Sequence, residues 1–214
     1  MTTRVKICGI TRLEDGRAAI EAGADLLGFN FHPSSPRSIL PAQCAEITTQ
    51  LRKEFPKTVL VGVFVNQPTE RVQTILDECG LQLAQLHGDE TPEMLAALGG
   101  RGFKAFRGIP EREADFQDYT KSRSGAFPAL LVDALVKGVY GGSGVTADWQ
   151  AAAGLAARLP LLLAGGLTTE NAAQAVRQVR PWGVDCASGV ESAPGVKDAG
   201  KMRAFIKAVR ESEI

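Results

Sequence analysis

The sequence predicts an α/β protein, a single (β/α)8 TIM barrel with eight parallel strands over residues 1–214, because eight short apolar segments alternate with segments of helical periodicity. The apolar segments begin 21 to 33 residues apart, which suits βα units of a parallel sheet. A doubly wound sheet is the main competitor, but it usually has fewer strands and a GxGxxG turn, which is absent after the first strand. The expected strands are 4–8, 25–31, 58–65, 81–88, 102–108, 129–134, 160–166 and 183–189.

Helices are expected between these strands. The i, i+3, i+4, i+7 spacing of one buried helical face occurs at Val72, Ile75, Leu76 and Cys79. It recurs near the C-terminus at Met202, Phe205, Ile206 and Val209. Thr91 before Pro92 is typical of an N-cap followed by proline at the first helical position. Residues 111–123 carry a weak pattern and predict a short or irregular helix.

Charge and composition exclude several classes of partner. Lysine plus arginine equals aspartate plus glutamate at 24 each, so no bulk field attracts nucleic acid or an anionic membrane. No apolar run reaches the roughly 18 residues that span a bilayer. The first residues lead directly into a strand rather than a leader peptide, so we expect a cytoplasmic protein.

The four cysteines predict reduced thiols. They stand at 8, 44, 79 and 186 without a CxxC pair, and the chain has only two histidines, so neither a zinc site nor a disulfide framework is indicated. Cys44 and Cys79 fall on apolar helix faces and Cys186 lies in an expected strand, which favours packing roles for these three.

Polar residues close most of the expected strands, and in a (β/α)8 barrel the carboxyl ends of the strands carry the active site. These residues are Cys8, Asn30, Asn66, His87, Arg107, Asp133, Gly165, Gly166 and Asp185. Polar residues also end strands for reasons of solvation alone. The set therefore predicts a site at this rim without naming its chemistry.

Two loops predict a phosphate site. Gly165 and Gly166 follow the seventh strand, where Thr168 or Thr169 is expected to cap the next helix. Ser188 and Gly189 follow the eighth strand and are expected to open a short extra helix. Exposed backbone N–H groups and a helix N-terminus favour an anion, and barrels frequently bind phosphate with these two loops. The alternative is that the glycines only make tight turns.

Two other loops carry candidate features. Residues 137–149 are rich in glycine, which predicts a loop that closes over substrate, with an ordinary surface loop as the alternative. Asp148 is expected to cap a helix beginning at Trp149. The loop HPSSPRS carries His32 and Arg37. The planar fork of Arg37 suits a substrate carboxylate, and a surface ion pair is the alternative.

Cys8 and Asp133 are the candidate proton carriers, because strands one and six lie nearly across the barrel mouth. A thiol and a carboxyl group on opposite sides of one substrate suit a base and an acid. A thiol ordinarily titrates near pH 8.5, so a base role requires that its thiolate be favoured. Lys6 shares the strand face of Cys8 and is expected to stabilise that thiolate. Packing of Cys8 and helix capping by Asp133 remain the alternatives.

The motifs together resemble one enzyme family. They are KICGIT, GFNFHPSSPRS, VGVFVN, LAQLHGDE, LLVDA, GGSG, LAGGL with Asn171, and SGVE followed by PGVKD. In this order, from residue 6 to about residue 198, they resemble phosphoribosylanthranilate isomerase of tryptophan biosynthesis.

The resemblance implies a barrel that isomerises N-(5-phosphoribosyl)anthranilate by an Amadori rearrangement, without cofactor or metal. It implies Cys8 as general base and Asp133 as general acid, Arg37 on the anthranilate carboxylate, and phosphate on Gly165, Gly166, Ser188 and Gly189. His87 and Asp185 are expected to contact the substrate. Asp185 is the rival of Asp133 for the acid role, but contact with ribose hydroxyls or orientation of its loop is the favoured role. The expected partner is this phosphorylated small molecule, with no nucleic acid or membrane, and the chain is expected to be a monomer or homodimer.

Two motifs depart from the family pattern. GGSG, with Ser143, stands where GGTG is more usual and retains a hydroxyl. DCASG replaces DVSSG, so a hydroxyl is lost at Ala187, which predicts weaker phosphate binding while Ser188 remains.

Two other functions agree less well with the sequence. Ribulose-phosphate epimerase, another phosphosugar barrel, relies on metal ligands that include histidines, and here only His87 stands at a strand end. A non-catalytic sensor of a phosphorylated metabolite has no need of an acid and a base, so Cys8 and Asp133 argue against it.

Overall fold

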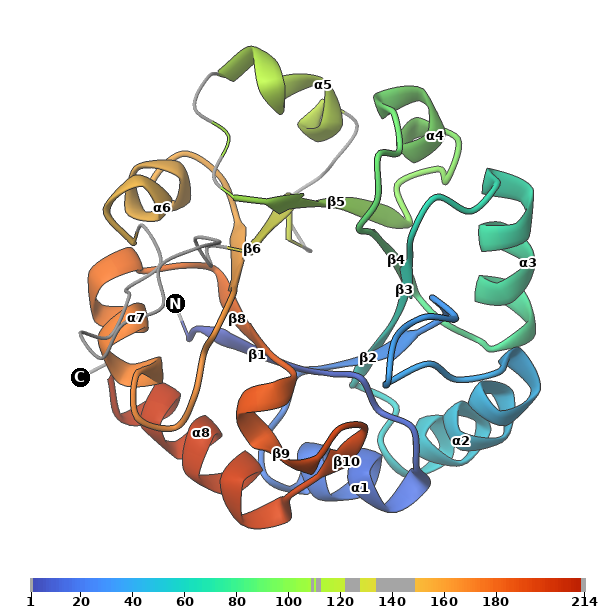
Figure 1. Cartoon of the computed structure of the whole chain (residues 1–214), viewed down its shortest axis with the longest axis horizontal. Coiled ribbons are helices and arrows are strands. Elements are labelled where there is room, and N and C mark those ends of the chain that lie inside the picture. Colours follow the sequence, from blue (N-terminus) through green and yellow to red (C-terminus); the bar gives the residue numbers. More distant parts are fainter. Residues whose placement is uncertain (1, 109, 111–112, 122–127, 134–148, 213–214) are drawn as a thin grey trace.

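The computed structural model describes residues 2–108, 110, 113–121, 128–133 and 149–212. Eight parallel strands close into a barrel in chain order, with β1 paired to both β2 and β8 (Figure 1). The predicted barrel is confirmed. The strands are β1 (Arg4–Cys8), β2 (Leu26–Asn30), β3 (Val59–Phe64), β4 (Leu83–Leu86), β5 (Gly102–Arg107), β6 (Leu130–Asp133), β7 (Leu161–Ala164) and β8 (Gly183–Cys186).

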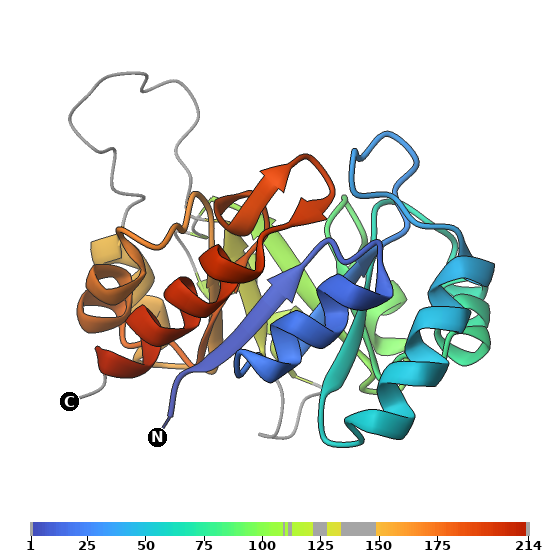
Figure 2. The same ribbon diagram turned by 90° about the horizontal axis from the view of Figure 1, so that it is seen from below.

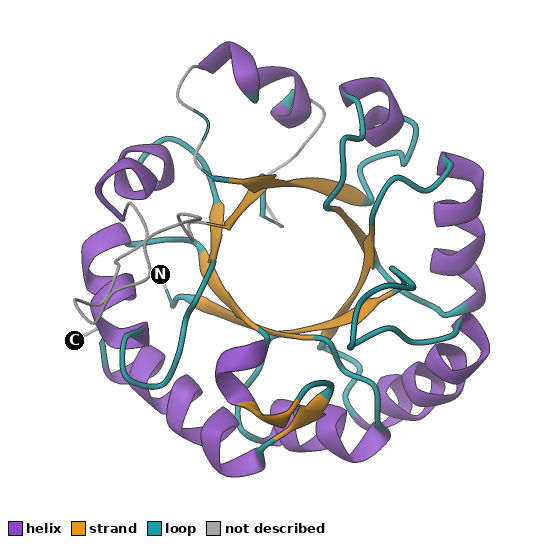
Figure 3. Cartoon of the chain, viewed as in Figure 1, coloured by secondary structure: helices purple, strands orange, loops and turns teal. Residues whose placement is uncertain are grey.

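Helices surround the barrel as an outer ring (Figure 3). They are α1 (Leu13–Glu21), α2 (Pro41–Glu54), α3 (Thr69–Glu78), α4 (Pro92–Ala96), α5 (Gln117–Thr120), α6 (Trp149–Ala156), α7 (Ala172–Val179) and α8 (Ala199–Glu211). None of them is long and apolar enough to cross a membrane, within the ranges given above.

Local sequence explains where several helices lie. The apolar faces predicted for α3 and α8 are buried, with Cys79 just beyond the last residue of α3. Thr91 is the N-cap of α4, and its Oγ1 accepts a hydrogen bond from the Met94 N–H at 3.4 Å. The weak pattern in the fifth unit matches a 3₁₀ turn, Glu113–Asp115, and the four-residue helix α5.

Two apolar layers hold the barrel. The interior is filled by side chains that alternate along the strands, namely Leu26, Val61, Leu83, Phe103, Ala105, Leu131, Leu162 and Ala164. The residues between them on each strand, such as Val5 and Ile7 of β1, pack outward against the helices. By this alternation Lys6 and Cys8 face the interior, above the apolar filling.

The chain adds a small structure after β8. A 3₁₀ turn, η2 (Ser188–Val190), leads into β9 (Glu191–Ala193), which pairs antiparallel with β10 (Val196–Lys197). Figure 2 shows this hairpin and the β2–α2 loop rising from the rim at which β1 ends. The rim that carries the predicted site is therefore built up by two segments far apart in sequence.

Candidate active site

The structure places the predicted site residues at the carboxyl ends of the strands. Cys8, Asn30, Arg107 and Asp133 are the last residues of β1, β2, β5 and β6, and His87 directly follows β4. Asp185 lies within β8, and the glycine pair follows β7. β1 and β6 are separated by β7 and β8 on one side of the barrel and by four strands on the other. Cys8 and Asp133 thus stand on well-separated parts of one rim.

Asn66 has a structural role at this rim. Its φ is +51°, its backbone N–H donates to Glu90 Oε1 at 2.8 Å, and its side-chain oxygen accepts from the Asp89 N–H at 2.6 Å. These bonds tie the β3–α3 turn to the loop that follows His87.

Lys6, Cys8 and Asp185 form a buried cluster inside the barrel. Lys6 Nζ donates to Asp185 Oδ1 at 2.9 Å, and the Lys6 side chain is fully buried. Gly28, the register partner of Cys8, leaves room for the cluster, since a Cβ there would lie 2.8 Å from Cys8 Sγ and 3.0 Å from Lys6 Nζ. The thiol and the ammonium therefore share the space above one glycine.

The pKa of Cys8 is shifted upward, whereas the predicted thiolate requires a downward shift. Burial raises the pKa of the Cys8 thiol, Lys6 acts to lower it, and the Asp185 carboxylate raises it again, so the net shift is upward. Burial opposes the charge of Lys6, but Asp185 and Cys8 outweigh it and raise the pKa of Lys6. Lys6 has the predicted effect on Cys8 but does not outweigh burial in the free protein.

His87 interacts with charged groups from both sides of the barrel mouth. Burial lowers its pKa, the carboxylates of Asp133 and Asp185 act to raise it, and Arg107 and Lys6 act to lower it. The imidazole is therefore neutral at neutral pH. The backbone N–H of His87 donates to the Phe64 carbonyl at 2.8 Å, which fixes the main chain that carries the ring.

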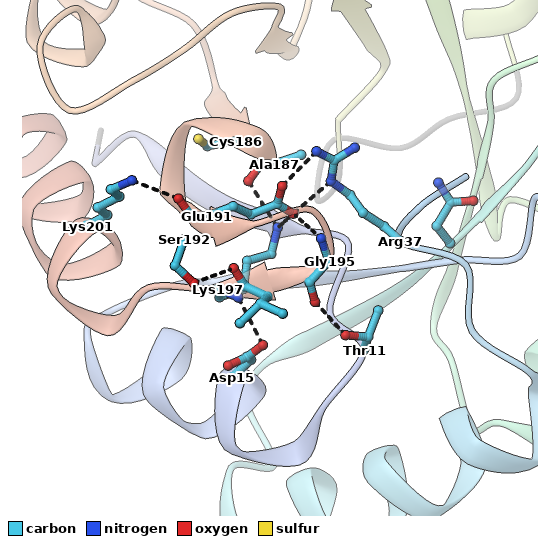
Figure 4. A network of polar contacts seen from close by, with 12 residues as sticks. Thr11, Asp15, Arg37, Cys186, Ala187, Glu191, Ser192, Gly195, Lys197 and Lys201 are labelled. Atoms are coloured by element: carbon cyan, nitrogen blue, oxygen red, sulfur yellow. Dashed lines mark hydrogen bonds and ion pairs between the residues drawn. The ribbon is translucent and has the colours of Figure 1, made fainter. Parts of the chain in front are cut away.

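Arg37 reaches the rim from the β2–α2 loop and is held by Glu191 (Figure 4). Arg37 Nε donates to Glu191 Oε1 and Nη2 to Oε2, both at 2.7 Å. The Arg37 stem packs on Gly9, where a Cβ would lie 2.5 Å from the Arg37 Cδ. Gly9 follows Cys8, so the glycine beside the thiol makes room for this arginine. The ion pair that was the alternative for Arg37 is present.

A second cation shares Glu191. Lys197 Nζ donates to Glu191 Oε1 at 2.8 Å and to the Ala187 carbonyl at 3.0 Å, and its side chain is fully buried. Burial acts to raise the pKa of Glu191, but Arg37 and Lys197 outweigh it and lower that pKa. One carboxylate between two cations leaves one net positive charge on this group of three residues.

Sequence reasoning missed Glu191 and Lys197. Glu191 lies in the SGVE motif and Lys197 in the PGVKD motif, so the available signal was one charged residue in each motif. Their partnership depends on the β9–β10 hairpin. The Lys197 N–H also donates to Asp15 at 3.1 Å and the Thr11 hydroxyl donates to the Gly195 carbonyl at 2.7 Å, which ties this hairpin to the β1–α1 segment.

The two predicted phosphate loops lie against each other. Gly165 and Gly166 have φ of +100° and +64°, which only glycine adopts without strain. Gly189 approaches the other loop so closely that a Cβ would lie 2.0 Å from the Leu167 carbonyl oxygen. The predicted short helix after β8 is confirmed as η2. Backbone from both loops therefore meets at one place on the rim.

The cap predicted in the first of these loops is wrong. The N-cap of α7 is Asn171 rather than Thr168 or Thr169, and its side chain makes no cap bond. Asn171 instead braces the loop, since its Oδ1 accepts from the Thr168 N–H at 2.8 Å and its Nδ2 donates to the Gly166 carbonyl at 2.9 Å. A side chain that spans the loop supports the glycine turn directly.

The other cysteines pack as predicted. Cys44 on α2 and Cys79 at the end of α3 are buried, and the Cys186 thiol donates to the Leu167 carbonyl at 3.2 Å. Burial raises the pKa of Cys186 to about 12. Ser143 and Asp148 lie outside the described residues, as does all of the loop 137–149 except Trp149, which begins α6 as predicted. No three His, Cys, Asp or Glu side chains of the described ranges gather as a metal site would require.

Comparison with known proteins identifies the family. Residues 5–208 match the family model of N-(5'-phosphoribosyl)anthranilate isomerase. The chain belongs to this family. It is 47% identical over 209 residues to the isomerase of Pelobacter propionicus, covering 98% of this chain and 96% of that protein. The chain is therefore an isomerase of tryptophan biosynthesis.

Solved structures of the family agree in fold. A phosphoribosyl anthranilate isomerase in complex with reduced 1-(o-carboxyphenylamino)-1-deoxyribulose 5-phosphate matches with a TM-score of 0.83 and 36% identity, over 98% of this chain and 100% of that one. Monomers of the dimeric isomerase of Thermotoga maritima match with a TM-score of 0.80 and 36% identity, over the same shares.

Proposed function

We propose that this isomerase converts N-(5-phosphoribosyl)anthranilate into 1-(2-carboxyphenylamino)-1-deoxyribulose 5-phosphate, with Cys8 as general base and Asp133 as general acid. The observation that carries the assignment is the buried thiol of Cys8 beside the ammonium of Lys6, on the same rim as Asp133. A relative binds a reduced form of this product, which supports the substrate class.

The reaction needs one proton given and one proton taken. Asp133 protonates the furanose ring oxygen, which opens the sugar to a protonated Schiff base. Cys8 then removes the C2 proton, which that iminium acidifies, and the enolamine tautomerises to the aminoketone. A thiol and a carboxyl group on separate strands suit these opposite roles on one bound molecule.

The raised pKa of Cys8 fits this order of events. In the free protein burial keeps the thiol protonated and therefore uncharged. A cationic Schiff base in the mouth adds a second positive charge beside that of Lys6, and opposite charge favours the thiolate. The thiolate form is then favoured at the stage that requires a base.

Among the described residues, Glu191 is the side-chain partner of the Arg37 guanidinium, and the edge it leaves is the proposed site of the anthranilate carboxylate. Glu191 occupies the side of the guanidinium formed by Nε and Nη2, whereas a guanidinium has five N–H donors. The Nη1 and Nη2 edge therefore remains for a second, end-on carboxylate. Glu191 fixes the plane of the fork, and Lys197 offsets the charge of Glu191 so that an anion is still attracted.

The phosphate end of the substrate is assigned to the β7–α7 and β8–η2 loops. Backbone N–H groups of Gly165, Gly166, Ser188 and Gly189 are the proposed donors, which fits the close approach of Gly189 to Leu167. His87 and Asp185 are further proposed contacts of the substrate. A homodimer is the assembly to test first, because the T. maritima relative is dimeric.

The first experiment compares wild type with Cys8→Ala. Phosphoribosylanthranilate is made in situ and the loss of its fluorescence is followed. General base catalysis supplies about 10²–10⁴-fold, so kcat of Cys8→Ala is expected to fall by that factor or more. Cys44→Ala is the matched control, because it removes another buried thiol, one that lies on helix α2 and not on a barrel strand, and it should leave kcat near wild type.

Two results contradict the proposal. A decrease of less than roughly tenfold in folded Cys8→Ala returns the thiol to a packing role. An inert wild type that still binds the substrate supports a metabolite sensor instead. Circular dichroism of each variant separates loss of chemistry from loss of fold.

A further inference from the structure

Gln85 is a buried amide on the inner face of β4. It shares the inner strand face with Leu83 and His87, and its register partners are Val63 on β3 and Phe103 on β5. It is 2% exposed, although apolar side chains fill most of this layer of the barrel. A polar group in such a place needs a hydrogen-bond partner or a functional reason.

The Gln85 amide contacts the ring of His87. Gln85 Nε2 lies 3.2 Å from His87 Nδ1. An amide nitrogen only donates, so Nδ1 is the acceptor and the proton of the neutral ring is on Nε2. In this orientation one of the two amide N–H groups of Gln85 donates to Nδ1.

Gln85 Oε1 has no hydrogen-bond partner among the residues that the structure describes. A buried unsatisfied oxygen destabilises a fold, and an apolar side chain of similar size at residue 85 would avoid this. The glutamine therefore lowers stability here, and the group that benefits is His87. Residues that break a local rule of folding in this way are expected at functional sites.

The neutral state of His87 makes its tautomer matter. The charged groups that act on the ring are Asp133 and Asp185, which favour the imidazolium, and Arg107 and Lys6, which oppose it. Burial adds to the second pair, so the ring is uncharged at neutral pH. An uncharged imidazole has one N–H donor and one nitrogen with a lone pair, and the tautomer decides which of the two Nε2 presents to the substrate.

We propose that Gln85 is a positioning residue that holds His87 as the Nε2–H tautomer, so that the ring donates a hydrogen bond to an oxygen of the substrate. Nδ1 faces Gln85 on the inner side of the strand, and Nε2 is on the far side of the ring. The proposal rests on His87 as a substrate contact, but its effect on the ring is measured without substrate.

The first test is the protonation of the ring nitrogens by long-range ¹H–¹⁵N correlation spectra. The chain has two histidines, so a His32→Gln variant assigns both rings. In wild type at neutral pH, His87 is expected to show a protonated Nε2 and an unprotonated Nδ1. Gln85→Glu is nearly isosteric and only accepts when ionised, so it should move the proton to Nδ1 or give the imidazolium. Gln85→Leu should give a mixture of tautomers.

The second test separates positioning from packing. Gln85→Leu should keep or raise the melting temperature while kcat/KM falls about tenfold, the factor that corresponds to one neutral hydrogen bond. Gln85→Glu should fall further. In a His87→Ala background neither substitution should reduce kcat/KM further, because the two residues act as one unit.

Three results overturn the proposal. A protonated Nδ1 on His87 in wild type reverses the direction of the hydrogen bond. Unchanged tautomers in Gln85→Leu show that other groups fix the ring. A decrease in kcat/KM that persists in the His87→Ala background shows that Gln85 acts through packing. If the tautomer changes but kcat/KM does not, the contact between His87 and the substrate is refuted, while the effect of Gln85 on the ring stands.

Discussion

Two buried lysines on this barrel have the same partner chemistry and different surroundings. Lys6 on β1 and Lys104 on β5 each place Nζ 2.9 Å from a carboxylate, Asp185 and Glu90 respectively. Lys6 faces the barrel interior, whereas Lys104 alternates with the interior residues Phe103 and Ala105 and faces the helices.

The difference lies in what else each ammonium touches. Lys104 Nζ also donates to the carbonyl oxygens of Leu86 and Gly88, so its three donors all have partners in the protein. Lys6 has Asp185 and the Cys8 sulfur beside it. A cation with every donor engaged by loop backbone fixes architecture, whereas a cation shared with a thiol changes the chemistry of that thiol.

The largest expected effect is at Lys6. The Lys6→Met/Asp185→Asn variant removes both charges, so that no unpaired ion stays buried, and leaves Cys8 without the cation that lowers its pKa. Because less of the Cys8 thiolate then forms, kcat/KM should fall by about 10²-fold or more. Asp185→Asn alone measures how much of this decrease in kcat/KM comes from the loss of the Asp185 carboxylate. A folded double variant with near-normal activity would contradict the role given to Lys6.

The second expected effect is on stability, at Lys104. Lys104→Met leaves the Glu90 carboxylate buried without its cation, which should lower the free energy of unfolding by about 3–5 kcal/mol. The kcat of the folded protein should stay near wild type. Urea unfolding and kcat at low temperature measure the two quantities. A large loss of kcat with intact stability would make Lys104 a part of the site and remove the contrast with Lys6.

The pH dependence sharpens the contrast further. A base acts when deprotonated, so kcat/KM should rise with pH through the pKa of Cys8 in the free enzyme, above the ordinary thiol value near 8.5. Asp185 raises that pKa, so Asp185→Asn should move the rise to lower pH. Glu90→Gln, the matched change at the other lysine, should not move it. A profile that shifts equally in both variants would count against the assignment.

The smallest expected effect concerns a third buried lysine, Lys197. Without it, Glu191 neutralises Arg37, and the rim attracts the substrate carboxylate less. Lys197→Met should raise KM about tenfold, or ~1.4 kcal/mol, with little change in kcat. Steady-state kinetics measure both constants. A lowered kcat at unchanged KM would show that Lys197 acts on the chemical step instead.

Sequence patterning predicted the barrel because each βα unit carries local signals. The apolar runs place β1 at Arg4–Cys8 as expected, and the spacing of Val72, Ile75 and Leu76 identifies the buried face of α3. These signals are periodic, so they survive without knowledge of distant contacts. The fifth unit was weak in sequence and is short in the structure, for the same reason.

Site residues were found where a motif or a strand end marked them, and missed where a contact made them. Cys8 and Arg37 stood in recognisable strings. Glu191 acquires its role only because the hairpin after β8 folds over Arg37, which lies 154 residues earlier in the chain. Gln85 reads as a polar residue in an apolar strand until its contact with His87 is known.

The sequence by itself determined the order of the strands, the rim that carries the site and the residue types that could give and take protons. Only the tertiary structure decided that Asp185 pairs with Lys6 beside the thiol, that Glu191 holds Arg37 and is shared with Lys197, and that burial outweighs Lys6 in setting the pKa of Cys8. The physical reason is range. Periodic burial is written in neighbouring residues, whereas charge interactions and desolvation depend on atoms that folding brings together from distant segments.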